Sequence, residues 1–241
     1  MRGGHLHTYV LVHGAWHSGE CWERLIPLLA EDGHEVLSPS LTGHGETKDL
    51  MSPEVGLDTY VADIVQLFLD RDLSDVVLVG HSFAGMIISL VADRLPDRVA
   101  HLVYLDAMDP IDGQAGVDIV PAAQGLIDEA AASAVPWRIP PLPPQFFGVV
   151  EQADVAWLSS ILTDESAYIF QQPAKLDNPT SAAIPVSYIR CVGPKPASSA
   201  RQPRSAVRPN GRPAELWELE SGHDCMVTAP ARLADILLKI E

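Results

Sequence analysis

The clearest structural signal in the chain is Val76-Val77-Leu78-Val79-Gly80-His81-Ser82-Phe83-Ala84-Gly85-Met86-Ile87-Ile88. An aliphatic run ends at a glycine, a serine follows two residues later, and apolar residues then recur at helical spacing. This pattern predicts a strand, a sharp turn with Ser82 at its apex, and a helix. Such a turn exposes the side chain at its tip and leaves the next backbone N–H at a helix N-terminus, where negative charge is favoured. We therefore interpret Ser82 as a candidate nucleophile; the alternative is an ordinary strand-to-helix turn that contains a serine by chance.

The residues beside Ser82 are small, as a strand and a helix in close approach require. Gly80, Ala84 and Gly85 supply them, although the usual G-x-S-x-G pattern has its last glycine where this chain has Ala84. One additional methyl group crowds the turn without forbidding it.

Further apolar runs alternate with helical patterns along the chain. Strands are expected at 8–12, 35–39, 76–79, 98–105, 185–192 and 215–219. The strongest helical signal covers residues 57 to 70, where apolar residues recur at i, i+3, i+4, i+7 and i+8. A shorter helix is expected to carry Trp22, Leu25, Ile26 and Leu29 on one face. This alternation predicts an α/β fold with a doubly wound, mostly parallel sheet.

The alternation of strands and helices stops between residues 110 and 184, which hold no strand signal. We expect a helical cap inserted into a core formed by residues 1–109 and 185–241. Large aromatic residues there and in the loop after the first strand are candidates for the substrate pocket: Trp16, Trp137, Phe146, Phe147 and Trp157. The alternative is a helical subdomain that uses its aromatic residues as its own core. Residues 193–213 are rich in proline and predict a loop or a broken helix.

Composition narrows the classes of partner. The 241 residues carry a formal net charge of −16, which disfavours nucleic acid and anionic membranes as partners. The three cysteines are too few and too scattered for a disulfide framework or a zinc site. No metal and no cofactor is expected. The first residues lack the apolar core of a signal peptide, and no apolar run approaches the length of a membrane span. We therefore expect a cytoplasmic protein. Its expected partner is a small-molecule apolar substrate, and its oligomeric state stays open.

Polar residues follow the predicted strands, and the carboxyl ends of parallel strands form one rim where ligands bind. His13, Ser82, Asp106 and His223 all come directly after strands. A serine hydroxyl needs a base within hydrogen-bond reach, and that base needs an acceptor that holds its tautomer. His223 is the candidate base, and His81 is interpreted as a packing or supporting residue. The backbone N–H groups of Ala15 and Phe83 are the candidate oxyanion hole.

Three segments in this order carry a resemblance: Val10-Leu11-Val12-His13-Gly14-Ala15-Trp16, Gly80-His81-Ser82-Phe83-Ala84-Gly85 and Ser221-Gly222-His223. Together they resemble the α/β-hydrolase fold family, and within it the small esterase branch that includes plant methylesterases and hydroxynitrile lyases. The resemblance implies Ser82 as nucleophile, His223 as base, and Ala15 and Phe83 as oxyanion donors. It implies no substrate.

This chain differs from that branch in the position of the triad acid. In the branch, the acid follows the strand after the cap. Here that place reads Cys191-Val192-Gly193-Pro194-Lys195-Pro196, without a carboxylate. Asp106 is the first substitute and Asp109 the second, and a missing acid is the third possibility. Asp224 is excluded because a residue adjacent to His223 does not turn back easily onto its ring.

The sequence predicts a cofactor-independent serine hydrolase that cleaves a small or medium apolar ester or lactone through an acyl-enzyme. Hydroxynitrile lyases of this branch carry a lysine directly after the catalytic histidine, and Asp224 stands there in this chain, which disfavours cyanohydrin cleavage. Two alternatives stay open: a non-hydrolytic lyase or cyclase on the same fold, and a ligand-binding receptor with weak catalysis.

Overall fold

The central sheet contains six strands, all parallel, in a computed structural model that describes residues 6–193 and 213–240. The strand order is β2-β1-β3-β4-β7-β8. The strands are β1 (Thr8–Val12), β2 (Glu35–Leu37), β3 (Val76–His81), β4 (Val99–Leu105), β7 (Val186–Cys191) and β8 (Glu215–Leu219). The predicted α/β class and parallel sheet are therefore confirmed, and each predicted strand is present.

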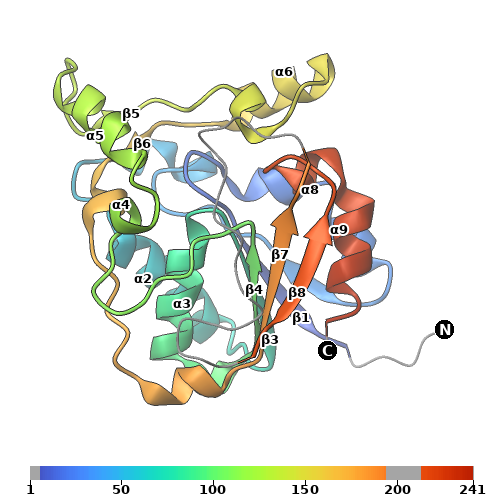
Figure 1. The fold of residues 1–241 in the computed structure, drawn as a ribbon. Coiled ribbons are helices and arrows are strands. Elements are labelled where there is room, and N and C mark those ends of the chain that lie inside the picture. Colours follow the sequence, from blue (N-terminus) through green and yellow to red (C-terminus); the bar gives the residue numbers. More distant parts are fainter. Residues whose placement is uncertain (1–5, 194–212, 241) are drawn as a thin grey trace.

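Helices cover both faces of this sheet (Figure 1). One face packs against α2 (Leu57–Asp70) and α3 (Ala84–Arg94), and the other against α1 (Ile26–Ala30) and α9 (Pro230–Leu237). Successive residues of β3 alternate between them: Leu78 belongs to a first core cluster with α2 and α3, and Val79 belongs to a second core cluster with α9. All residues of β3 are buried, which is why this strand reads as a continuous apolar run.

The helix predicted at residues 57 to 70 has the expected bounds, with Leu57, Tyr60, Val61, Ile64 and Phe68 buried. The single helix expected around residues 22 to 29 was wrong. A 3₁₀ turn, η1 (Gly19–Trp22), precedes α1, and Pro27 lies in the first turn of α1. Proline lacks a backbone N–H and suits the first turn of a helix, so a new helix begins there instead of continuing the earlier turn.

Of the segment between β4 and β7, residues 123–166 lie over the carboxyl ends of the strands, whereas the residues directly before β7 lie at the opposite end of the sheet (Figure 1). The elements of the segment are α4 (Gly116–Ile119), α5 (Ala123–Ala131), β5 (Arg138–Ile139), η4 (Pro144–Phe147), α6 (Gln152–Ile161), β6 (Glu165–Ser166), α7 (Tyr168–Gln171) and η5 (Pro179–Ala183). The expectation of a strand-free segment was wrong, because β5 and β6 form a short antiparallel pair. Strands of two residues are too short to show a period. Buried residues of the segment join both core clusters, for example Phe170 the first and Leu158 the second.

Three further short helices complete the described fold: η2 (Gly45–Leu50), η3 (Pro96–Arg98) and α8 (Cys225–Thr228). The proline-rich loop predicted at 193–213 lies almost wholly outside the described residues. Among the residues that are described, no helix combines the length and the apolar character needed to cross a membrane. Cys21, Cys191 and Cys225 are buried free thiols.

Candidate active site

Ser82 lies at the apex of a tight turn between β3 and α3. Its φ angle is +58°, in the left-handed region, and its side chain is half-buried although both chain neighbours are buried. The Ser82 backbone N–H donates to the Leu105 carbonyl (3.2 Å), and its carbonyl accepts from the Met108 N–H (2.9 Å). The strained turn is therefore held from both sides by the chain that leaves β4.

The small residues of this turn each face a close neighbour. A Cβ atom on Gly80 would lie 2.8 Å from the Ala84 carbonyl oxygen, and one on Gly85 would lie 1.7 Å from the Met108 carbonyl oxygen. Both positions therefore demand glycine, and the closest approach is that of Gly85 to the chain after β4. The methyl group of Ala84 is buried without displacing the turn, which explains how the chain departs from the usual pattern.

The ring of His223 and the carboxylate of Asp106 meet at the rim of the sheet. His223 Nδ1 lies 2.7 Å from Asp106 Oδ2, and both side chains are almost fully buried. Asp106 follows β4 directly, with a φ angle of +44°, and its Oδ1 atom accepts from the Cys191 N–H at the end of β7 (3.3 Å). With Nδ1 directed to the carboxylate, Nε2 is the ring nitrogen that can exchange a proton with a hydroxyl group.

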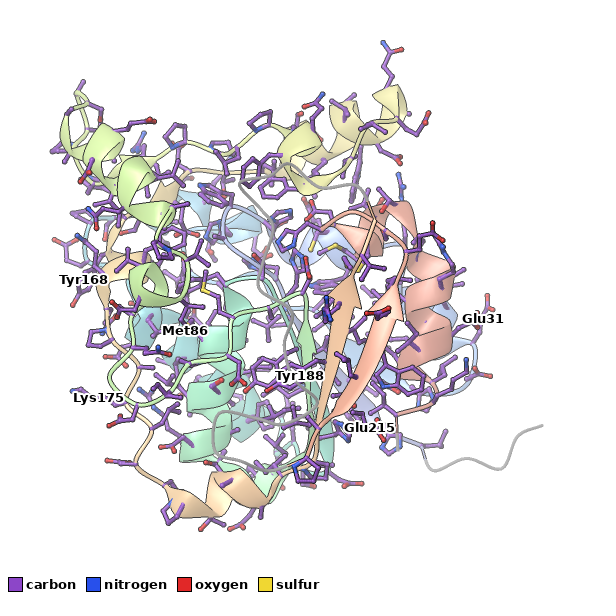
Figure 2. The ribbon with its side chains drawn as sticks, viewed as in Figure 1. Glu31, Met86, Tyr168, Lys175, Tyr188 and Glu215 are labelled. Carbon is purple, nitrogen blue, oxygen red and sulfur yellow. The ribbon has the colours of Figure 1, made fainter. Side chains whose placement is uncertain are left out.

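The other two carboxylates considered as the acid, Asp109 and Asp224, have different partners. The Tyr188 hydroxyl donates to Asp109 Oδ2, and Figure 2 shows Tyr188 at mid-sheet, well below the carboxyl ends of the strands. Asp224 Oδ2 lies 2.9 Å from His17 Nε2. Of the acids considered from the sequence, the structure brings Asp106 to the His223 ring.

His81 lies beneath the His223 segment. Its Nε2 atom is 3.1 Å from the His223 carbonyl oxygen, and the two ring centroids are 4.5 Å apart. These contacts match the supporting position that the sequence assigned to His81.

The loop after β1 brings Ala15 to the nucleophile turn. A Cβ atom on Gly14 would lie 2.8 Å from Ser82 Cβ, so only glycine allows this approach. The Gly14 carbonyl accepts from His13 Nδ1 (2.9 Å) and from the His17 N–H (3.3 Å). Because the C=O and N–H of a trans peptide point in opposite directions, this carbonyl orientation turns the Ala15 N–H the other way. Within the described residues, neither the Ala15 nor the Phe83 N–H donates a hydrogen bond.

The tautomer of His13 is fixed by its second nitrogen. His13 Nε2 accepts from the Leu41 N–H at 3.0 Å, so the ring proton is on Nδ1, where it reaches the Gly14 carbonyl. Burial, with a smaller effect of the His44 and His17 charges, holds the pKa of His13 well below its ordinary value. The ring therefore stays neutral and keeps this arrangement.

Trp16 is held in a left-handed conformation by residues of the cap segment. Its φ angle is +67°; its N–H donates to Glu165 Oε2 (3.2 Å), and its carbonyl accepts from the Thr163 N–H (2.9 Å). The fully buried Glu165 also accepts from the Tyr60 hydroxyl (2.6 Å). Burial, with Glu165 adding to it, raises the pKa of Tyr60 well above its ordinary value. Sequence reasoning missed Glu165, because no motif covers the segment that carries it.

Three of the five aromatic residues predicted to line the pocket lie together. The Phe147 ring centroid is 6.2 Å from that of Trp16 and 6.1 Å from that of His223, and Phe146 lies 5.6 Å from Phe147. Phe170, which was not assigned to the pocket, joins them 5.9 Å from Trp16 and 5.3 Å from Phe83.

The other two predicted pocket residues, Trp137 and Trp157, have arginine side chains beside their rings. The Trp157 ring is covered by the Arg24 guanidinium at 5.1 Å and packs against the second core cluster. The Trp137 ring is covered by the Arg138 guanidinium at 5.1 Å. No ring contact within the described residues links either tryptophan to the Phe147 group.

Comparisons with known proteins agree with the fold described above. The profile of the alpha/beta hydrolase family matches residues 9–236. A carbendazim hydrolyzing esterase of Nocardioides sp. (strain SG-4G) is 33% identical over 241 residues, which cover 95% of this chain and 98% of that protein. Methylesterase 2 of Arabidopsis thaliana is 36% identical over 104 residues, which cover 42% of this chain and 40% of that protein. The structure of an extracellular alpha/beta-hydrolase from a Paenibacillus species matches with a TM-score of 0.79 and 25% identity, covering 97% of this chain and 98% of that one.

Proposed function

The chain belongs to the alpha/beta hydrolase family, and from this premise we propose that it is a serine esterase that cleaves small or medium apolar esters or lactones. Ser82 is the nucleophile, His223 the base and Asp106 the acid of the triad. The N–H groups of Ala15 and Phe83 form the oxyanion hole. The single observation that carries this assignment is the 2.7 Å contact between His223 and Asp106 at the strand ends next to the Ser82 turn.

In the proposed reaction, Ser82 Oγ attacks the ester carbonyl and its proton passes to His223 Nε2. Asp106 stabilises the imidazolium that forms, while the two N–H groups bind the oxyanion. The tetrahedral intermediate collapses, the alcohol leaves with the proton of His223, and an acyl-enzyme remains. Water then attacks the acyl group and gives its proton to His223. The second tetrahedral intermediate collapses, His223 returns the proton to Ser82 Oγ, and the carboxylic acid is released. No metal or cofactor takes part in this proposal.

The ester linkage is supported by relatives that are esterases by name, a carbendazim hydrolyzing esterase and a methylesterase. The apolar character of the substrate is supported by Trp16, Phe147 and Phe170, whose rings gather beside His223. In this proposal residues 110–184 act as the cap that closes over the substrate, and the three free thiols fit a cytoplasmic location.

Hydrolysis is favoured over a lyase or cyclase reaction by the position of Asp106. The non-hydrolytic alternative was motivated by the absence of a carboxylate after the strand that follows the cap. Asp106 reaches His223 from the preceding strand, so the motivation for that alternative is removed.

The test uses a generic aryl ester and a fluorophosphonate probe. We expect wild-type protein to hydrolyse the ester and to be labelled on Ser82, and Ser82→Ala to lose both while its melting temperature stays near that of the wild type. Undiminished turnover by the folded Ser82→Ala protein would refute the proposal, as would a wild-type protein that neither reacts with the probe nor hydrolyses any aryl ester.

A further inference from the structure

A second histidine and a second carboxylate lie next to the proposed triad, and neither has a role in the mechanism above. His17 and Asp224 are both almost wholly buried, at 1% and 0% exposed, and His17 Nε2 is 2.9 Å from Asp224 Oδ2. The other ring nitrogen, His17 Nδ1, is 2.8 Å from the Ala15 carbonyl oxygen. The histidine therefore connects a residue of the oxyanion loop to the residue that follows His223.

Both partners of the His17 ring are acceptors. A carbonyl oxygen and a carboxylate oxygen have no proton to donate, so each ring nitrogen must carry one. A ring with protons on both nitrogens is an imidazolium. Burial lowers the pKa of His17, but the charge and hydrogen bond of Asp224, with the Ala15 carbonyl, outweigh it and raise that pKa above its ordinary value.

We propose that His17 and Asp224 form a buried, charged pair that positions the Ala15 N–H relative to His223, so that oxyanion hole and base keep one fixed geometry. This inference rests on the proposed esterase function, and both residues are positioning residues that do not touch the reacting atoms. The pair has the same chemical composition as the His223–Asp106 pair but joins two other segments, the loop after β1 and the start of α8.

Asp224 is suited to this role because its own backbone is held independently. Its N–H donates to the Phe147 carbonyl (3.0 Å), and its carbonyl accepts from the Val227 N–H (3.0 Å) in the first turn of α8. The Phe147 ring in turn stacks on His223 with an interplanar angle of 26°. The Asp224 carboxylate is therefore held in place. It holds the His17 ring, and the His17 ring holds the Ala15 carbonyl.

The peptide group between Ala15 and Trp16 is held at its N–H as well as at its carbonyl. The Ala15 carbonyl and the Trp16 N–H belong to one peptide group, and the Trp16 N–H donates to Glu165 Oε2 at 3.2 Å. Without the His17 contact, the peptide would be held on the Glu165 side alone. Small displacements of a catalytic donor have large effects on rate, because the hydrogen bond must match the oxyanion in the transition state.

The first test compares Asp224→Asn with the wild type on an aryl ester. Asparagine keeps an acceptor or donor for the His17 ring but removes the charge. We expect kcat to fall about 10- to 100-fold, and KM to change less than about threefold, because the Ala15 N–H that the pair positions bonds to the oxyanion of the transition state. Asp63→Asn is the matched control, since Asp63 accepts two hydrogen bonds from Thr42 outside the site, and we expect its kcat to match the wild type. A folded Asp224→Asn protein with the kcat of the wild type would overturn the proposal.

The second test needs no altered active site. In ¹⁵N-labelled wild-type protein, long-range ¹H–¹⁵N correlation spectra should show both His17 ring nitrogens protonated at pH 7, with His17→Gln identifying the signals. One unprotonated His17 nitrogen at that pH would overturn the charged pair even if Asp224→Asn failed to fold. A wild-type protein with neither ester turnover nor fluorophosphonate labelling would instead count against the esterase function. The spectra would still show whether His17 and Asp224 form a charged pair.

Discussion

The His223 ring and the Asp106 carboxylate are in hydrogen-bond contact at 2.7 Å, although 117 residues separate them in the chain. Asp106 is directed to this position by its left-handed backbone and by the Cys191 N–H. The contact fixes the proton of His223 on Nδ1 in the resting state, which is the tautomer that a base for Ser82 requires.

Asp106→Asn tests this relationship, because asparagine has nearly the shape of aspartate but favours the wrong tautomer of His223. We expect kcat for an aryl ester to fall about 10⁴-fold with little change in melting temperature. Asp109→Asn is the matched control and should retain the kcat of the wild type, since Asp109 bonds to Tyr188 instead. If Asp109→Asn lost activity and Asp106→Asn did not, the acid would be misassigned.

The nucleophile turn gives a prediction on stability. Gly85→Ala would bring a Cβ atom to 1.7 Å from the Met108 carbonyl oxygen, so the chain after β4 must move. Overpacking of this kind costs about 1–3 kcal/mol or more in the free energy of unfolding. Urea unfolding measures it, and the same displacement should lower esterase activity through Ser82 and Asp106.

Gly125→Ala is the control for that experiment, because a Cβ atom on Gly125 meets nothing within 4 Å. Gly125 lies inside α5, where alanine is favoured over glycine by about 0.5–1 kcal/mol, so this variant should be more stable than the wild type. Equal unfolding midpoints for both variants would show that Gly85 is not sterically required.

Glu165 gives a prediction on the cap segment. Glu165→Ala removes the acceptor of three buried donors, the Trp16 N–H, the Tyr60 hydroxyl and the Ser166 N–H, and each unsatisfied donor costs about 1–3 kcal/mol. Glu165→Gln keeps one side-chain oxygen and should lose less. We expect the order wild type, Gln, Ala both in unfolding free energy and in kcat, because Trp16 is adjacent to Ala15. An unchanged kcat in Glu165→Ala would show that the contact between Glu165 and Trp16 does not affect the position of the Ala15 N–H.

The elements that could be predicted from the sequence are those with a local signal. The Ser82 turn is encoded within thirteen consecutive residues, Val76 to Ile88, and α2 is encoded by one uninterrupted helical period. The acid was left open between Asp106, Asp109 and none, because its contact with His223 depends on which strands end side by side. No spacing within the chain reports that arrangement.

Residues that act through tertiary contacts had no readable signal. Glu165 lies in a strand of two residues, and its partners Trp16 and Tyr60 come from distant segments. Trp137 and Trp157 were assigned to the pocket because they are aromatic, and this assignment stays a prediction; in the structure an arginine guanidinium lies over each ring. Composition therefore indicated an aromatic cap, while the direction of each ring depended on packing.

The last prediction concerns pH and His13. Its pKa is well below the ordinary value in the folded protein, chiefly through burial, with the His44 charge adding to the shift. Between the folded and the unfolded pKa, the unfolded chain binds a proton that the folded protein does not bind. The stability that a neutral His13 contributes is therefore present above the unfolded pKa of about 6.5, and it is lost as pH falls below that value.

His13→Asn should weaken this acid dependence, because asparagine keeps a donor for the Gly14 carbonyl but does not titrate. In urea unfolding between pH 5 and 7, the free energy of the wild type should fall more steeply with acidification, by up to about 1.4 kcal/mol per pH unit, than that of the variant. The variant should be less stable than the wild type at pH 7, since the Leu41 N–H loses its acceptor, and the difference should narrow toward pH 5. Parallel slopes for the two proteins would mean that His13 takes up its proton in the folded state, and its hydrogen bond from Leu41 would then have to break.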